Sequence, residues 1–144
     1  MTYNFKNAIV RIPNKTIQCG LSLQNLEPKF EYVVKEHDNY VNALKEAGLE
    51  INLLDSLEEF PDSIFVEDPA LTYKSDVIIL NPADPTRNGE KNIIKNEITH
   101  FFHNTSSIED GFVEGGDILN INNHFILGLS NRTNKLGAEK LSII

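Results

Sequence analysis

The tripeptide Phe-Val-Glu occurs twice in this chain, at residues 65–67 and 112–114, an offset of 47 positions (112 − 65). An arginine follows each copy at a similar distance, Arg87 at 20 residues after the first glutamate and Arg132 at 18 residues after the second. We interpret the repeat as a strand with a carboxylate, a second strand and a loop arginine, written twice. Two such units can aim matched acids and arginines at one axis, and both signs of charge suit a zwitterionic ligand such as an amino acid.

Further acidic residues surround the first copy, where Asp62, Glu67 and Asp68 stand close together in the sequence. A buried carboxylate needs a cationic partner or several hydrogen-bond donors, and the alternative is a solvated strand end with ordinary surface acids. In the second copy, two glycines follow Glu114 directly. They permit close approach of backbone or ligand, or they mark a bulge at the start of a hairpin.

Both arginines lie in polar loops, Arg87 within Asp-Pro-Thr-Arg-Asn-Gly and Arg132 within Ser-Asn-Arg-Thr-Asn. A guanidinium group makes planar, two-pronged hydrogen bonds to a carboxylate. The two arginines could therefore clamp one ligand carboxylate. For any single arginine in such a loop, simple exposure to solvent is the commoner alternative.

The other reactive side chains give weaker signals. The histidines have no partners at the spacing of a metal site, so we expect no zinc; they are His37, His100, His103 and His124. Cys19 is the single cysteine, which excludes an internal disulfide and favours a reducing compartment. It precedes a glycine in a polar loop and is interpreted as incidental. No phosphate-binding or dinucleotide glycine motif occurs, and no cofactor is expected.

Length and charge set further limits. The 144 residues predict one domain, residues 1–144, and a net charge of −8 argues against a nucleic-acid partner. The N-terminus has no apolar run of signal-peptide type, and no stretch approaches the roughly 20 apolar residues that cross a membrane. We expect a cytoplasmic protein with no membrane partner.

The elements that must position these residues can be read from apolar spacing. Residues 8–12 and 50–54 predict strands, and residues 64–67 predict a strand after a turn at Pro61. Between the first two, an apolar stripe predicts a helix from Pro28 to a stop at Gly48. It consists of Phe30, Val33, Val34, His37, Val41, Leu44 and Ala47.

The second half of the chain gives a similar pattern. Residues 76–80 predict a strand covered on both faces, and residues 90–103 predict a helix after a loop. Residues 118–121 and 125–129 flank Asn122-Asn123 and predict a hairpin. Residues 135–144 begin an amphipathic helix whose apolar pattern is still running at the last residue. We therefore expect one part of a longer protein.

Four segments resemble the dimethylarginine dimethylaminohydrolase family, which belongs to a superfamily with arginine deiminases and amidinotransferases. They are residues 36–48, 60–68, 112–119 and 129–134. The resemblance spans nearly the whole chain in order. It implies a mixed α/β fold, a five-bladed propeller of ββαβ modules around a polar centre, with about three modules present here. It also implies chemistry in which a cysteine thiolate attacks the guanidinium carbon, a histidine protonates the leaving amine and water hydrolyses the covalent intermediate.

The resemblance assigns binding roles to residues of both copies. Asp68 would accept hydrogen bonds from the guanidinium of the ligand, and Glu67 would support the site. Asp62 would bind the amino-acid end, and Arg87 and Arg132 would bind the α-carboxylate.

Two further roles follow from the resemblance. The backbone carbonyl of Leu21 would contact the ligand, and Glu114 would orient the catalytic histidine. That histidine and the nucleophilic cysteine belong to later parts of family members, and nothing here stands in either motif. The chain is thus expected to be the substrate-binding, N-terminal part of a guanidino-group hydrolase, inactive alone. It would self-associate or pair with its remaining part.

Two other functions stay open. One is a non-enzymatic module that binds an amino acid, and the other is a relative of arginine deiminases or amidinotransferases with a different substrate.

Overall fold

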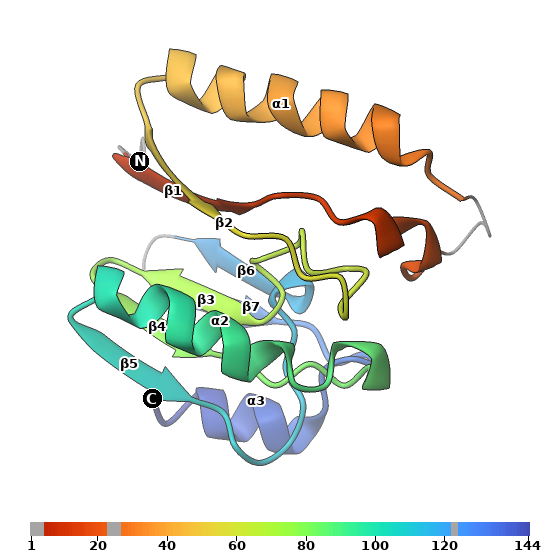
Figure 1. The fold of residues 1–144 in the computed structure, drawn as a ribbon. Coiled ribbons are helices and arrows are strands. Elements are labelled where there is room, and N and C mark those ends of the chain that lie inside the picture. The colour runs from red at the N-terminus through yellow and green to blue at the C-terminus, as the bar shows by residue number, and fades with distance from the viewer. Residues whose placement is uncertain (1–4, 23–26, 122–123) are drawn as a thin grey trace. The chain divides into compact units, whose positions relative to one another are not determined.

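The computed structural model describes residues 5–22, 27–121 and 124–144 (Figure 1). Its contacts divide the chain into two compact units, Met1–Val66 and Glu67–Ile144. The expectation of one domain over residues 1–144 stays a prediction.

The first unit is a strand–helix–strand arrangement. It contains β1 (Asn7–Arg11), the 3₁₀ helix η1 (Lys15–Cys19), α1 (Phe30–Glu46) and β2 (Glu50–Leu54). The two strands pair in parallel, with Asn7 opposite Glu50. A parallel pair needs a long crossover, and α1 supplies it, running alongside both strands in Figure 1.

The predicted helix before Gly48 is confirmed. Gly48 has a φ of 89°, a conformation that glycine adopts without strain and that ends the helix. The predicted apolar stripe is the partly shielded side of α1, as Val33, Val34 and Leu44 show. No residue of α1 is fully buried.

The predicted strand at residues 64–67 is wrong, because this segment forms turns. Phe65 donates its amide to the carbonyl of Asp62 at 3.1 Å, and Val66 donates to Ile64 at 3.1 Å. The amides that a strand would offer to a neighbour are therefore satisfied locally. The loop before them is fixed by Asn14, whose Nδ2 donates to the carbonyls of residues 57 and 60 at 3.0 Å each.

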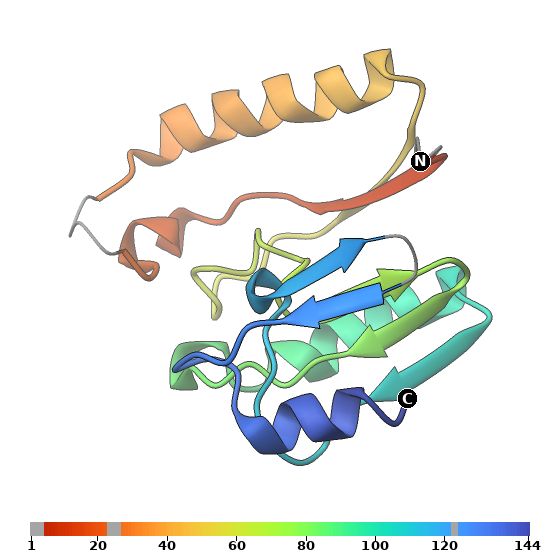
Figure 2. The same cartoon turned by 180° about the vertical axis from the view of Figure 1, so that it is seen from behind.

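The second unit holds two hairpins, each followed by a helix. Its strands and longer helices are β3 (Ala70–Tyr73), β4 (Asp76–Ile79), α2 (Glu90–Ile98), β5 (Asn104–Ser107), β6 (Ile118–Ile121), β7 (His124–Leu127) and α3 (Lys135–Leu141). Short 3₁₀ helices lie between them, namely η2 (Pro85–Arg87), η3 (Thr99–Phe101) and η4 (Gly115–Asp117). β3 pairs antiparallel with β4, β4 pairs in parallel with β5, and β6 pairs antiparallel with β7. Figure 2 shows β6 and β7 side by side, with α3 below them.

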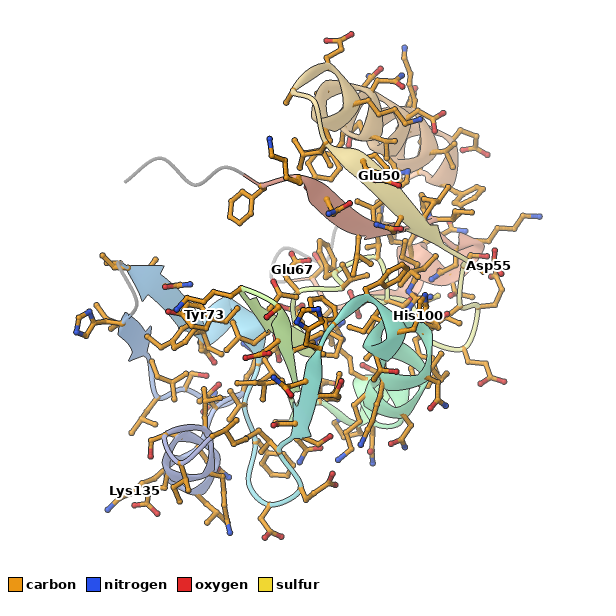
Figure 3. All side chains as sticks on the ribbon, turned by 90° about the vertical axis from the view of Figure 1, so that its left-hand side faces the viewer. Glu50, Asp55, Glu67, Tyr73, His100 and Lys135 are labelled. Atoms are coloured by element: carbon orange, nitrogen blue, oxygen red, sulfur yellow. The ribbon has the colours of Figure 1, made fainter. Side chains whose placement is uncertain are left out.

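The sequence repeat therefore corresponds to a repeated structural order: a hairpin, an arginine loop and a helix. One detail differs from the expectation. The carboxylate of each copy does not lie on a strand; it comes just before the first strand of its hairpin. The side chains of Tyr73 in β3 (Figure 3) and Phe125 in β7 meet edge to face, with ring centroids 5.3 Å apart. This contact links the two hairpins.

Several predicted boundaries shift. The strand at residues 76–80 and the helices that begin at Glu90 and Lys135 are present, but α2 and α3 end early, at Ile98 and Leu141. The predicted hairpin is formed by β6 and β7, while its turn at Asn122-Asn123 lies outside the described residues. β3 and β5 were not predicted. β5 reads Asn-Thr-Ser-Ser and forms only because β4 offers an edge to pair with.

The core of the second unit joins both copies of the repeat. Leu80, Ile108 and Val113 are fully buried at its centre. Partly buried side chains from both hairpins and α3 pack on them, namely Leu71, Ile78, Ile118, Leu127 and Leu141. Val113 belongs to the second Phe-Val-Glu and donates its amide to the carbonyl of Asn81, two residues after the end of β4. The core thus holds the start of the second repeat against the end of the first hairpin. No helix in the described part of the chain is both long and apolar enough to cross a membrane.

Candidate functional site

The two copies of the repeat touch each other through their backbones. Gly115 donates its amide to the carbonyl of Asp68 at 3.0 Å. A Cβ atom on Gly115 would lie 2.0 Å from the carbonyl oxygen of Glu67, so only glycine fits this approach. The segments that carry the predicted acids are therefore neighbours in space.

The loop before α2 folds on itself to place Arg87. Asp84 accepts hydrogen bonds from the amide of Thr86 at 2.9 Å and from its hydroxyl at 2.6 Å. Pro85 occupies the first turn of η2, where no amide is needed. As a result Arg87 turns inward, and its side chain is only 3% exposed.

Arg87 pairs with two carboxylates. Its Nε and Nη2 donate to Oε2 and Oε1 of Glu90 at 2.8 and 2.9 Å, and its Nη1 donates to Oδ2 of Asp68. Burial alone would lower the pKa of Arg87, but the hydrogen bonds and charge of Glu90, together with those of Asp68, outweigh it and raise the pKa. The guanidinium is therefore charged wherever the protein is folded.

Arg132 in the second copy also lies between two carboxylates. Its Nη1 donates to Oε1 of Glu114 at 2.6 Å, and its Nη2 lies 3.6 Å from Oδ1 of Asp117. The side chain of Arg132 is 49% exposed, whereas that of Glu114 is buried. Of the two predicted arginines, Arg132 is thus the one open to a ligand.

Asp117, three residues after Glu114, holds the loop of Arg132 by hydrogen bonds. Its Oδ2 accepts from the hydroxyls of Ser130 at 2.6 Å and Thr133 at 2.7 Å. The Thr133 hydroxyl in turn accepts from the amide of Glu114 at 3.2 Å. This chain of bonds fixes the loop on both sides of Arg132.

Gly116 lies between the acid of the first copy and the arginine of the second. A Cβ atom built on it would lie 3.4 Å from Nη2 of Arg132 and 3.6 Å from Oδ1 of Asp68. These two charged groups therefore border the same bare stretch of backbone. Close approach of backbone requires glycine at position 115, whereas a Cβ at position 116 would meet its neighbours at ordinary contact distances.

The cluster carries more negative than positive charge. Four carboxylates pair with two guanidiniums, which leaves a formal excess of two negative charges; the acids are Asp68, Glu90, Glu114 and Asp117. Such an excess favours a bound cation.

The acids respond differently to this environment. Burial raises the pKa of Glu114, and the negative charge of Asp68 raises it further, against the opposing charge of Arg132. Although the Glu67 side chain reaches the surface, desolvation by surrounding atoms still raises its pKa, and Asp68 acts in the same direction. Burial alone would raise the pKa of Asp117, but the hydroxyls of Ser130 and Thr133 lower it below its ordinary value.

The first unit brings its two predicted residues together. The amide of Leu21 donates to both carboxylate oxygens of Asp62, at 3.2 and 3.1 Å. Asp62 is buried, and Gly20 fits closely against it, because a Cβ there would lie 2.7 Å from Oδ1. Asp62 therefore fixes the backbone of Leu21, whose carbonyl was expected to face a ligand.

Sequence reasoning missed the partners of the two arginines. Glu90 and Asp117 were given no role, although each is part of an arginine's carboxylate pair. The spacing of Glu90, three residues after Arg87, is the one available signal, since residues at i and i+3 share a helix face. Cys19 is exposed, and the described residues hold no group of three His, Cys, Asp or Glu side chains that could bind a metal.

Comparison with known proteins decides the family. A family model described as N,N dimethylarginine dimethylhydrolase, eukaryotic, matches residues 11–142. The chain belongs to the dimethylarginine dimethylaminohydrolase family. It is 38% identical over 143 residues to the N(G),N(G)-dimethylarginine dimethylaminohydrolase of Pseudomonas aeruginosa, covering 97% of this chain and 56% of that relative. A second relative of the same name, from Streptomyces coelicolor, is 29% identical over 139 residues and is covered to 54% of its length.

Solved structures of this family share the fold. A variant of the P. aeruginosa dimethylarginine dimethylaminohydrolase in complex with citrulline superposes with a TM-score of 0.92 at 37% identity, over 96% of this chain and 56% of that one. The mixed α/β fold therefore matches part of the family's structures. The N-terminal domain of the cyanobacterial arginine dihydrolase ArgZ, at 17% identity and a TM-score of 0.77, is similar in fold alone. This chain spans about half the length of its dimethylarginine dimethylaminohydrolase relatives.

Proposed function

We propose that this chain is the substrate-binding part of a guanidino-group hydrolase that converts methylated arginine to citrulline and methylamine. The observation that carries the proposal is the contact between the two copies of the repeat. The amide of Gly115 donates to the carbonyl of Asp68 and so brings the acid of one copy beside the acid and arginine of the other.

The charge of the cluster fits such a ligand. A methylated arginine has a guanidinium cation at one end and a zwitterionic amino acid at the other. Asp68 offers a carboxylate to the guanidinium, and the excess of negative charge in the cluster favours a cation. Arg132, half exposed, offers a guanidinium to the α-carboxylate.

Arg87 takes a narrower part in the proposal. Its side chain is buried against Glu90 and Asp68, so little of its guanidinium is open to a ligand carboxylate. The side chain of Arg132 is far more exposed. In this account Arg132 is the main anchor of the α-carboxylate, while Arg87 holds Asp68 in place and assists.

In the proposal, Asp62 and Leu21 of the first unit bind the amino-acid end of the ligand. Asp62 fixes the amide of Leu21, which leaves the Leu21 carbonyl as an acceptor for the amino-acid end of the ligand. Glu67 supports Asp68 from the adjacent position. These assignments follow the family resemblance residue by residue.

Catalysis requires groups from further polypeptide. The nucleophilic cysteine and the catalytic histidine belong to motifs that the 144 residues do not contain. Glu114 is then the group that orients the histidine, and further polypeptide completes the five-bladed propeller of which this chain forms about three modules. The chain alone therefore binds without turning over.

Binding calorimetry with Nω,Nω-dimethyl-L-arginine tests the proposal. The chain is expected to bind the ligand, and Asp68→Asn is expected to weaken binding at least tenfold. Asp110→Asn removes the same charge from a side chain that is 70% exposed, and it should leave the affinity within twofold. Equal effects of the two substitutions, or no binding by the unaltered chain, would reject the proposal.

A further inference from the structure

Glu90 lies outside every motif that relates this chain to its family, yet the structure buries it completely. Both of its oxygens accept from Arg87, at 2.8 and 2.9 Å. This two-pronged contact occupies the Nε–Nη2 edge of the guanidinium. The donor at the other side of the plane, Nη1, bonds to Asp68.

The local backbone places Glu90 for this contact. Gly89 has φ 103° and ψ −24°, a left-handed conformation that reverses the chain between the arginine and the start of α2. Glu90 is the first residue of α2, where the exposed amides of the helix favour a carboxylate. Arg87 and Glu90 therefore meet across a single turn whose geometry the glycine sets.

The contact with Glu90 also fixes how Arg87 meets Asp68, because the guanidinium is rigid. Because the group is planar, fixing one edge by two hydrogen bonds also fixes the direction of the remaining donors. Nη1 of Arg87 then holds Oδ2 of Asp68, while Oδ1 accepts no hydrogen bond from the described residues and borders Gly116. The orientation of Asp68 is thus set from Glu90, and one of its oxygens is left for a ligand.

We propose that Glu90 is a positioning residue, which acts through Arg87 to orient Asp68 toward the guanidinium of the ligand. The ligand part of this inference rests on the proposed function. If the Glu90–Arg87 ion pair only supported folding, replacing Glu90 would not change the effect of an Asp68 substitution on Arg87. If Glu90 positions the guanidinium, replacing Glu90 should weaken that effect.

Nitrogen-15 NMR of the arginine side chains tests the link without any ligand. In the unaltered chain the Nε–H of Arg87 should exchange slowly with water, and its resonance is assigned by its loss in Arg87→Lys. Glu90→Gln should accelerate exchange at least tenfold. Glu109→Gln removes the same charge from a side chain that is 73% exposed, and it should change exchange less than twofold.

The response to Asp68→Asn separates positioning from simple support. In the unaltered chain Asp68→Asn should shift the Arg87 Nε–H resonance, and in the E90Q background that shift should fall to less than half. Glu90→Asp keeps the charge but is one methylene shorter and cannot reach both donors, so it should show the same loss. It replaces Glu90→Gln if that variant does not fold. An undiminished shift in both backgrounds would overturn the proposal.

Ligand affinity adds the functional readout. Glu90→Gln and Glu90→Asp should each weaken binding of Nω,Nω-dimethyl-L-arginine at least tenfold, with Glu109→Gln within twofold. If the unaltered chain binds no ligand, the proposed function fails, while the exchange and shift measurements still decide the role of Glu90. If the chain binds and both Glu90 variants bind equally well, Glu90 has no positioning role.

Discussion

The amide of Gly115 donates to the carbonyl of Asp68 at 3.0 Å, and this hydrogen bond joins the two copies of the repeat. Each copy contributes an acid before a hairpin and an arginine after it. The bond therefore converts two separate patterns in the sequence into one cluster of charges.

Gly115→Ala should destabilise the second unit, because the new Cβ would lie 2.0 Å from a backbone oxygen that cannot rotate away. Overpacking of this kind costs about 1–3 kcal/mol or more. Gly128→Ala is the matched control, since its Cβ would meet its nearest atom at an ordinary 3.8 Å. Urea unfolding of both variants measures the difference, and equal stabilities would contradict the close approach.

Glu114→Gln should change stability in a pH-dependent way. The pKa of Glu114 is raised above its ordinary 4.5 in the folded state, so its ionisation opposes folding. Stability from this group is present below pH 4.5 and is lost as the pH rises through the folded pKa. The glutamine variant should therefore gain stability relative to the unaltered chain between pH 4 and pH 7 in thermal unfolding. A relative loss over that range would show that the Arg132 pair dominates instead.

Asp117→Asn should show the opposite dependence. Hydrogen bonds from Ser130 and Thr133 outweigh burial and lower the pKa of Asp117 below its ordinary 3.8. Its contribution is complete above pH 3.8 and is lost as the pH falls through the folded pKa. The variant should be less stable by about 1.5–3 kcal/mol at pH 6, the range for hydrogen bonds to a charged group, with a smaller difference at pH 3. A difference that does not shrink on acidification would contradict the assignment.

The chain should self-associate at high concentration. Large apolar side chains on β6, β7 and α3 and next to them are exposed, among them Leu119, Ile126, Leu129, Leu136 and Ile143. Such surface is commonly covered by a partner or by further polypeptide. Sedimentation should show an average mass that rises with concentration, and Leu119→Lys with Ile126→Lys should reduce the rise. A strictly monomeric chain at millimolar concentration would contradict this expectation.

Local sequence patterns predicted the elements with strong periodicity or clear stops. The helix before Gly48 and the starts of α2 and α3 follow from apolar spacing and glycine chemistry. β5 could not be predicted, because Asn-Thr-Ser-Ser becomes a strand only when β4 supplies its partner. The apolar Ile-Phe-Val of residues 64–66 wrongly indicated a strand. The amides of Phe65 and Val66 donate to nearby carbonyls in turns, so they do not pair with a neighbouring strand.

The sequence singled out several residues of the charge cluster but not the hydrogen bonds between them. The repeated motif pointed to Glu67, Glu114 and both arginines, and the family resemblance added Asp68. That Arg87 would be buried against Glu90 depends on the left-handed Gly89, and that Asp117 would fasten the second loop depends on two hydroxyls 13 and 16 residues away. Hydrogen-bond partners at such separations are set by the tertiary fold.

An NMR titration of the chain with Nω,Nω-dimethyl-L-arginine tests the central claim most directly, because one sample reports both binding and chemistry. We predict saturable shifts of the backbone amides of Asp68, Gly116 and Arg132, with no citrulline formed over days. Turnover to citrulline by this polypeptide alone, or amides in the cluster that remain unmoved at saturating ligand, would contradict it.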